Sequence, residues 1–153
     1  MQKQKGFSLI ELLIVVAIIL IIAAIAIPNL LKARISANES SAVGSVRTLN
    51  TASVQYATQC PNLGFPANLT VLGPGANDCT AAGIIDQVLV LGTKSGYTFV
   101  YAPGAATPNT TYTITATPIT VSVTGQRGFF SDQTGVIRYD PAGNATVASL
   151  PLQ

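Results

Sequence analysis

The run of residues 7–27 constrains the fold more than any other part of the sequence. It reads FSLIELLIVVAIILIIAAIAI, and Glu11 is the one charged residue among its 21. A helix of this length rises about 30 Å, which is the thickness of the hydrocarbon core of a bilayer. We therefore expect residues 7–28 to form a helix that can cross a membrane.

A helical pattern continues beyond Pro28. Apolar residues recur three, four or seven positions apart at Leu31, Ile35, Ala42, Val46, Leu49 and Tyr56. This spacing predicts that residues 29–59 form an amphipathic half of the same helix. A proline inside a helix removes one hydrogen bond and favours a bend. We expect one helix from about Ser8 to about Thr58, bent at Pro28 and ended by Pro61.

Two simpler interpretations of the apolar run are a secretory signal peptide and a plain membrane anchor. Lys3 and Lys5 precede the run, and Ala24-Ile25-Ala26 imitates a signal-peptidase site. However, the run is longer than the usual apolar region of about 7–15 residues, and no polar break precedes Ala26. A plain anchor explains the length but not Glu11.

Glu11 needs a partner if the segment enters lipid. A carboxylate at the centre of a bilayer costs about 2.5–3.5 kcal/mol, and less near its boundary. No basic residue lies within residues 7–27 to pair with it. The partner must therefore come from a new amino terminus or from another chain.

Residues 5–12, KGFSLIEL, followed by the apolar helix and Pro28, resemble the N-terminus of the type IV pilin family. The family includes the pseudopilins of type II secretion. The resemblance is close over residues 5–58. Beyond that point the chain resembles the family only in its general plan, a long helix followed by a sheet.

The resemblance implies a role for four residues. Gly6 would end a leader of residues 1–6 that a prepilin peptidase removes, and Phe7 would become an N-methylated terminus. Glu11 would pair with the Phe7 ammonium of a neighbouring subunit, so that a charge that is costly in lipid becomes favourable. Many members of the family have a glycine in the apolar helix, but this chain has none between Phe7 and Pro28. Loosening of the helix during assembly would then depend on Pro28.

The resemblance also implies partners and a location. The partners would be further copies in a helical homopolymer, the prepilin peptidase/N-methyltransferase, the inner-membrane assembly machinery and the membrane that holds the precursor. The chain would reside in the inner membrane and then in an extracellular pilus filament on the bacterial cell surface. The alternatives are a pseudopilin of a type II secretion system and a membrane-anchored periplasmic binding module.

Composition excludes several other functions. The chain has no histidine, so it lacks the commonest general base and metal ligand. Without a base to activate serine or threonine, we expect no catalytic residues and no enzyme activity. Only 9% of residues are charged, and the basic ones are scattered, which argues against specific binding of nucleic acid. We expect no cofactor.

The two cysteines, Cys60 and Cys79, favour a disulfide, because two thiols cannot complete a tetrahedral zinc site. A disulfide indicates an oxidising compartment and places the C-terminal part of the chain outside the cytoplasm. Three residues with side-chain oxygen atoms, Asp132, Asp140 and Asn144, are candidate calcium ligands. They lack EF-hand spacing and suit turns better, so we expect no metal ion.

Residues 60–153 are expected to form a globular head with a loop, the disulfide and an antiparallel sheet. Tyrosine, phenylalanine and isoleucine alternate with threonine, which is typical of strands with one buried face. The run of residues 84–91 fits a strand or a helical turn equally well. We expect an α+β fold in which the long helix covers three to four antiparallel strands. The predicted strands are residues 97–101, 112–116 with a continuation over 120–124, 128–131, and 136–139, the last two joined by a turn at 132–135.

Overall fold

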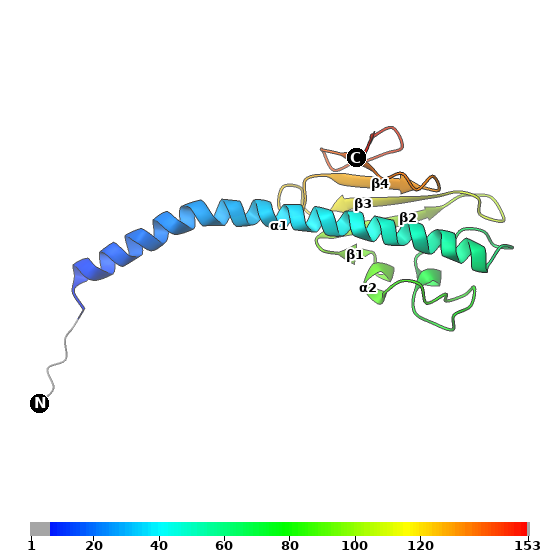
Figure 1. The fold of residues 1–153 in the computed structure, drawn as a ribbon, viewed down its shortest axis with the longest axis horizontal. Helices are drawn as coiled ribbons and strands as arrows, with labels where there is room; N and C mark the ends of the chain where they lie inside the picture. The colour runs from blue at the N-terminus through cyan, green and yellow to red at the C-terminus, as the bar shows by residue number, and fades with distance from the viewer. Residues whose placement is uncertain (1–6, 153) are drawn as a thin grey trace, which may run out of the picture. The chain divides into compact units, whose positions relative to one another are not determined.

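The long N-terminal helix forms as the sequence predicts. The computed structural model describes residues 7–152. Helix α1 spans Leu9–Gln59, within one residue of the expected limits at both ends, and contains Pro28 (Figure 1). The chain divides into two compact units, Met1–Arg34 and Ile35–Gln153.

In the first unit, the described residues form the N-terminal part of α1. Every residue from 7 to 34 is exposed except Ala23, which is half-buried. The exposed side chains include the large aliphatic residues that make up most of this segment. By length and composition, α1 is able to cross a membrane. Among residues 7–34, the part of this unit that the structure describes, nothing covers the apolar surface.

The second unit contains a six-stranded antiparallel sheet in which each strand pairs with the next one along the chain, in the order β1-β2-β3-β4-β5-β6 (Figure 1). The strands are β1 (Thr93–Lys94), β2 (Tyr97–Pro103), β3 (Tyr112–Pro118), β4 (Gly128–Asp132), β5 (Arg138–Asp140) and β6 (Leu150–Pro151). The predicted α+β class is confirmed. The predicted count of three to four strands is wrong.

The additional strands are too short to leave a pattern in the sequence. β1 and β6 have two residues each, whereas alternation becomes recognisable only over about four residues. Their neighbours β2 and β5 hold them in place through two paired positions each.

The predicted continuation of the second strand over residues 120–124 is also wrong. β3 ends at Pro118, and the following segment folds into a turn, in which the Thr124 N–H donates to the Thr120 carbonyl over 2.9 Å. A proline within a strand suits a sheet edge or a bulge, whereas β3 lies between β2 and β4. The proline is tolerated because it is the last residue of β3, beyond the four positions that pair with β4.

The ambiguous run of residues 84–91 contains a helix. Helix α2 (Gln87–Val90) is capped by Asp86, whose carboxylate accepts a hydrogen bond from the Leu89 N–H over 2.8 Å. A single 3-10 turn, η1 (Thr70–Leu72), precedes it in the loop after α1.

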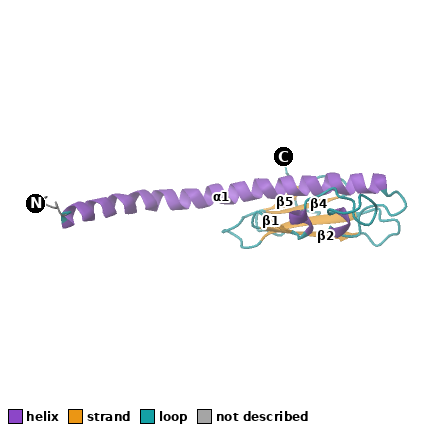
Figure 2. Ribbon diagram, turned by 90° about the horizontal axis from the view of Figure 1, so that it is seen from below, coloured by secondary structure: helices purple, strands orange, loops and turns teal. Residues whose placement is uncertain are grey.

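In the second unit, α1 lies along one face of the sheet (Figure 2). The hydrophobic core is formed by side chains of the helix and of that face. On α1, the buried residues recur at the helical spacing predicted for an amphipathic helix. On β2 and β3, alternate residues are buried, as expected. The main contributors are Ala42, Val46, Leu49, Ala52 and Tyr56 from α1, Tyr97 and Phe99 from β2, Tyr112, Ile114 and Ala116 from β3, and Phe129 from β4.

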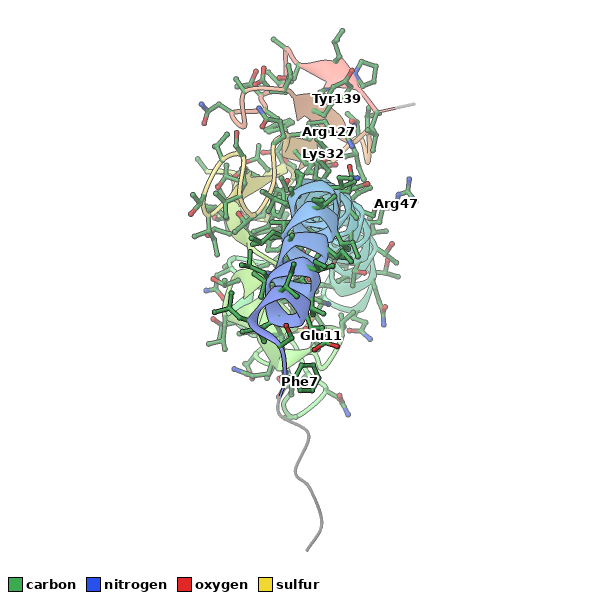
Figure 3. The ribbon with its side chains drawn as sticks, turned by 90° about the vertical axis from the view of Figure 1, so that its left-hand side faces the viewer. Phe7, Glu11, Lys32, Arg47, Arg127 and Tyr139 are labelled. Carbon is green, nitrogen blue, oxygen red and sulfur yellow. A yellow bond between two sulfur atoms is a disulfide. The ribbon has the colours of Figure 1, made fainter. Side chains whose placement is uncertain are left out.

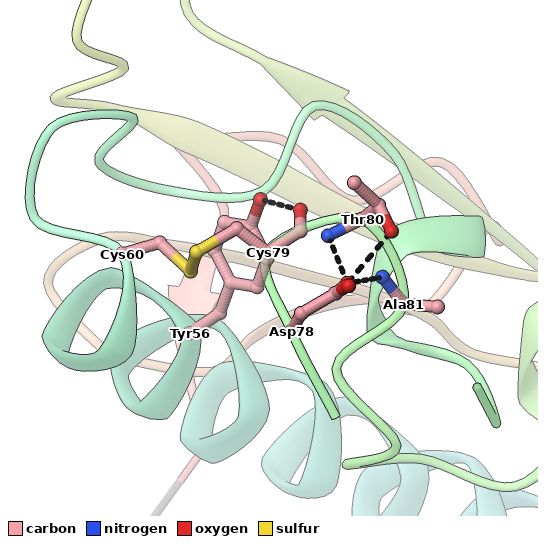
Figure 4. The surroundings of a disulfide bond; sticks show 6 residues. All are labelled: Tyr56, Cys60, Asp78, Cys79, Thr80 and Ala81. Atoms are coloured by element: carbon pink, nitrogen blue, oxygen red, sulfur yellow. Dashed lines mark hydrogen bonds between the residues drawn. A yellow bond between two sulfur atoms is a disulfide. The ribbon is translucent and has the colours of Figure 1, made fainter. Parts of the chain in front are cut away.

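A disulfide joins Cys60, directly after α1, to Cys79 in the following loop. The Tyr56 hydroxyl donates a hydrogen bond of 2.8 Å to the Cys79 carbonyl (Figure 4). Beside it, the Asp78 carboxylate accepts hydrogen bonds from the Thr80 hydroxyl and from the N–H groups of Thr80 and Ala81. These bonds lower the pKa of Asp78. The bridge and the turn together fasten the loop to the end of the helix.

We expect a Cys60→Ser/Cys79→Ser double variant to be less stable by about 3 kcal/mol in free energy of unfolding, because closing a loop of about 20 residues restricts the unfolded chain to that extent. Urea unfolding of the detergent-solubilised chain, followed by circular dichroism, measures the change. A thiol reductant should lower the midpoint of the parent chain and leave that of the variant unchanged. Equal midpoints for the oxidised parent and the variant would contradict the expectation.

Candidate assembly site

The candidate site begins at the N-terminal end of α1. Ser8 precedes the first helical residue, and its backbone N–H donates a hydrogen bond of 2.9 Å to Oε2 of Glu11. This is half of a capping box, in which an acidic residue at the third helical position satisfies a free N–H at the start of the helix. The pattern Ser-x-x-Glu was present in the sequence, and reasoning from the cost of a buried charge alone overlooked it.

Among the described residues, 7–152, Glu11 forms the capping bond and no salt bridge. Among residues 7–152, the salt bridges are Arg127–Glu39 and Lys94–Asp86. Phe7, whose side chain is 86% exposed, lies at the same end of the helix as Glu11 (Figure 3). Gly6, the predicted last residue of the leader, lies outside the described residues. Pro28 is exposed within α1.

Glu11 therefore stands at the start of a bare apolar helix. Exposed leucine, isoleucine and valine side chains surround the helix from position 9 to position 31. Such a surface is suited to lipid tails or to other apolar helices, because both remove it from water. The carboxylate can form hydrogen bonds and ion pairs of defined geometry, whereas the aliphatic side chains around it make only non-directional contacts.

A second charged group, Glu39, joins α1 to the segment just before β4 in the second unit. The sequence analysis did not identify this residue. The residue is 6% exposed. Its Oε2 accepts a hydrogen bond of 2.8 Å from Nε of Arg127 and lies 2.8 Å from Nη2 of the same guanidinium in a salt bridge. Its Oε1 accepts 3.0 Å hydrogen bonds from the N–H groups of Gln126 and Arg127. A signal existed in the sequence, because Glu39 is three residues before Ala42 on the buried face of the helix.

The pair has an electrostatic consequence. Burial disfavours the charged form of Glu39, but the hydrogen bonds from the backbone N–H groups of Arg127 and Gln126 and from the Arg127 side chain outweigh it. The pKa of Glu39 therefore lies below its ordinary value of 4.5. The Arg127 guanidinium also lies 5.8 Å from the ring centre of Phe129 and 5.6 Å from that of Tyr139, where ring faces attract cations (Figure 3).

Of the three candidate calcium ligands, Asp132 and Asp140 stabilise turns, and Asn144 lies in the loop before β6. Oδ1 of Asp132 accepts hydrogen bonds from the N–H and hydroxyl of Thr134, and Oδ1 of Asp140 accepts one from the Ala142 N–H. In the turn after Asp132, Gly135 has φ +74, the left-handed position expected there. Within residues 7–152, no group of three histidine, cysteine, aspartate or glutamate residues is placed to hold a metal ion.

Comparison with known proteins supports the importance of the N-terminal segment. A family model described as the prokaryotic N-terminal methylation motif matches residues 1–27. The type IV wide pilus major component PilA4 of Thermus thermophilus is 65% identical over 40 residues, 26% of this chain and 30% of that protein. The type IV major pilin protein PilA of Myxococcus xanthus is 46% identical over 57 residues, 37% of this chain and 26% of that protein.

A longer match extends into the second unit. A fimbrial protein of Pseudomonas aeruginosa is 36% identical over 113 residues, which cover 63% of this chain and 73% of that protein. The chain thus spans less than a third of the Thermus and Myxococcus relatives, but most of the Pseudomonas relative. No solved structure matches the chain.

Together, the motif and the fold define a class of prokaryotic proteins in which an N-terminal methylation motif opens a long apolar helix that continues into an α+β unit. Since the match to the fimbrial protein covers nearly three quarters of that relative, the family is clear as well. The chain belongs to the type IV pilin family.

Proposed function

We propose that this chain is a structural subunit of a type IV pilus and polymerises through the N-terminal half of α1. The observation that carries the proposal is the bare apolar surface of residues 7–31, with Glu11 as its one charged group. The relatives' names describe filament components rather than enzymes, and this agrees with a structural role. None of these names is that of a secretion pseudopilin, the nearest alternative.

Burial of aliphatic surface supplies the driving force for polymerisation. At about 25 cal/mol per Å², several hundred Å² buried per subunit stabilise the filament by many kcal/mol. In the membrane this gain is largely absent, because lipid tails are as apolar as leucine. The subunit therefore remains a membrane monomer until the inner-membrane assembly machinery extracts it. The finished filament lies outside the cell, where the disulfide is stable.

The carboxylate of Glu11 supplies the register between subunits. In the proposed sequence of events, the prepilin peptidase cleaves after Gly6, and Phe7 becomes a methylated ammonium. A neighbouring subunit's Glu11 then pairs with that ammonium through the carboxylate oxygen that the capping bond leaves free. Two groups that are costly to desolvate alone are thus buried together. Pro28 allows local loosening of a helix that has no glycine between residues 7 and 28.

The proposed organisation of the chain follows from these roles. Residues 1–6 are the cleaved leader, and residues 7–28 cross the membrane and later form the filament core. Residues 29–59 are the amphipathic half of the helix, and residues 60–153 are the head. The precursor resides in the inner membrane and the mature subunit on the cell surface.

The test is the identity of the amino terminus in filaments from native cells. Filaments are sheared from the cells, purified and digested, and the terminal peptide of this chain is sequenced by mass spectrometry. We expect N-methylated Phe7 as the first residue. A Gly6→Val chain, whose branched side chain does not fit a peptidase site made for glycine, should retain Lys3 and Lys5 and form no filaments. A parent chain that keeps residues 1–6, or never enters filaments, would refute the proposal.

A further inference from the structure

The turn between β3 and β4 exposes three aliphatic side chains, Ile119, Val121 and Val123, which we call the apolar knob. They are 55%, 48% and 52% exposed, respectively. The backbone beneath them is internally bonded: the Val123 N–H donates to the Thr120 carbonyl and the Ser122 N–H to the Gly125 carbonyl. The turn thus satisfies these backbone N–H groups internally while its three aliphatic side chains face the surroundings.

The apolar knob is held rigidly at the start of the second unit's helical stretch. The Asn38 side chain donates a hydrogen bond of 2.8 Å to the Thr124 carbonyl. One residue further along α1, Glu39 binds the N–H of Gln126, which follows the turn. Two consecutive residues of α1, Asn38 and Glu39, therefore hold the C-terminal end of the turn by hydrogen bonds. Presenting a fixed apolar surface costs little ordering entropy when a partner binds.

An apolar groove lies at the opposite end of β3. Its apolar lining comes from Leu63, Phe65, Ala67 and Ala106, and Tyr56, Thr107 and Asn109 complete it. Its volume is about 140 Å³. The Phe65 ring contacts Tyr112, the first residue of β3, with ring centres 4.7 Å apart. The groove and the apolar knob are thus separated by the length of β3. Along α1, Asn38 and Tyr56 are 18 residues apart, a rise of about 27 Å.

We propose that the apolar knob of one copy of this chain docks into the apolar groove of the next copy along the filament. The inference rests on the proposed function and adds a second contact between subunits. A convex and a concave apolar surface at opposite ends of one unit make a head-to-tail contact that leaves a free end on every copy, which is the geometry of open helical filaments. An apolar cavity of about 150 Å³ holds a benzene-sized group, so this groove accommodates a valine or isoleucine side chain.

The composition of the turn favours a second copy over a lipid surface as the occupant. Residues 119–125, ITVSVTG, contain no basic residue and no tryptophan or tyrosine, the residues that typically anchor segments at membrane surfaces. The groove is likewise lined by uncharged residues. Contact between identical copies therefore brings no like charges together.

The test is chemical cross-linking in filaments. Cysteines are introduced as Val121→Cys and Ala106→Cys in one chain, and intact filaments are treated with a short bismaleimide. Cys60 and Cys79 are bonded to each other, so the introduced thiols are the reactive ones. We expect a ladder of multimers on denaturing gels, because each copy contributes both a knob and a groove. Either single variant should give no ladder.

The control replaces Val121→Cys by Val100→Cys, which lies on β2 and is 55% exposed, and keeps Ala106→Cys. We expect about tenfold less cross-linked product from this pair, since Val100 lies outside the knob. Filaments that give no ladder from the knob–groove pair, a product that stops at dimers, or an equal yield from the control pair would each refute the docking.

A charge variant tests the same contact without cysteines. Val121→Asp should leave the unfolding midpoint and the membrane pool unchanged, because the side chain is exposed, and should lower filament yield about tenfold or more by burying an unpaired charge in the groove. Val100→Asp, the matched control, should assemble normally. Normal yield from Val121→Asp refutes the docking while leaving the proposed function intact, whereas absence of filaments from the parent chain refutes the proposed function itself.

Discussion

Replacing Glu11 with alanine is expected to leave the chain folded and in the membrane but to lower filament yield about tenfold or more, because truncating one partner of a buried charge pair leaves the other charge unpaired. The folded second unit should be unaffected, since Glu11 belongs to the other unit. Sheared filaments and the membrane fraction are quantified from the same cells, so that a loss of assembly is distinguished from a loss of protein.

Glu11→Gln separates the two roles of the side chain. Its amide oxygen can still accept the hydrogen bond from the Ser8 N–H, but it carries no charge. If pairing with a terminal ammonium drives assembly, this variant should assemble as poorly as Glu11→Ala. Filament yields close to those of the parent chain would show that helix capping is the role that matters, and the account of the charge would be wrong.

The second large effect is expected at the buried ion pair of the second unit. Glu39→Ala should lower the free energy of unfolding by about 1–3 kcal/mol, because two partly buried backbone N–H groups lose their acceptor and Arg127, whose side chain is 40% exposed, loses its ionic partner. Urea unfolding of the detergent-solubilised chain measures the change. Lys94→Ala is the matched control: its partner Asp86 is 3.5 Å away and both side chains are partly exposed, so the effect should stay within about 1 kcal/mol.

The same pair predicts a dependence of stability on pH. The pKa of Glu39 is lowered in the folded chain, so its contribution is fully present above the ordinary value of 4.5 and is lost as the pH falls through the lower folded value. The difference in unfolding free energy between the parent chain and Glu39→Gln should therefore shrink below about pH 4.5. A difference that stays constant from pH 7 to about pH 3 would contradict this account.

The features predicted correctly are those that repeat along the sequence. The limits of α1 follow from apolar spacing and from the stop at Pro61, and the buried faces of β2 and β3 follow from alternation. The short motif Ser-x-x-Glu at residues 8–11 indicates helix capping. The cost of a charge in lipid instead favours a partner for Glu11 in another chain. Both partners are compatible, because a carboxylate has two oxygens and the described bond uses one.

The missed features depend on contacts between distant residues. The pairing of Glu39 with Arg127 joins positions 88 residues apart, and no local pattern links them. The short strands β1 and β6 exist because longer neighbours offer them hydrogen bonds. The turn that replaced the predicted strand over 120–124 is stabilised by Asn38 from the helix, a tertiary contact that overrides the strand preference of valine and threonine.

The disulfide has a mechanical consequence. Cys60 and Cys79 are 19 positions apart, so the loop between them contains 18 residues. The disulfide closes this loop. If a pulling force separated the helix from the sheet, the disulfide would transmit the force, and the loop between the two cysteines would not be extended. Eighteen fully extended residues span about 60 Å, so the disulfide prevents each stretched subunit from lengthening by about that distance.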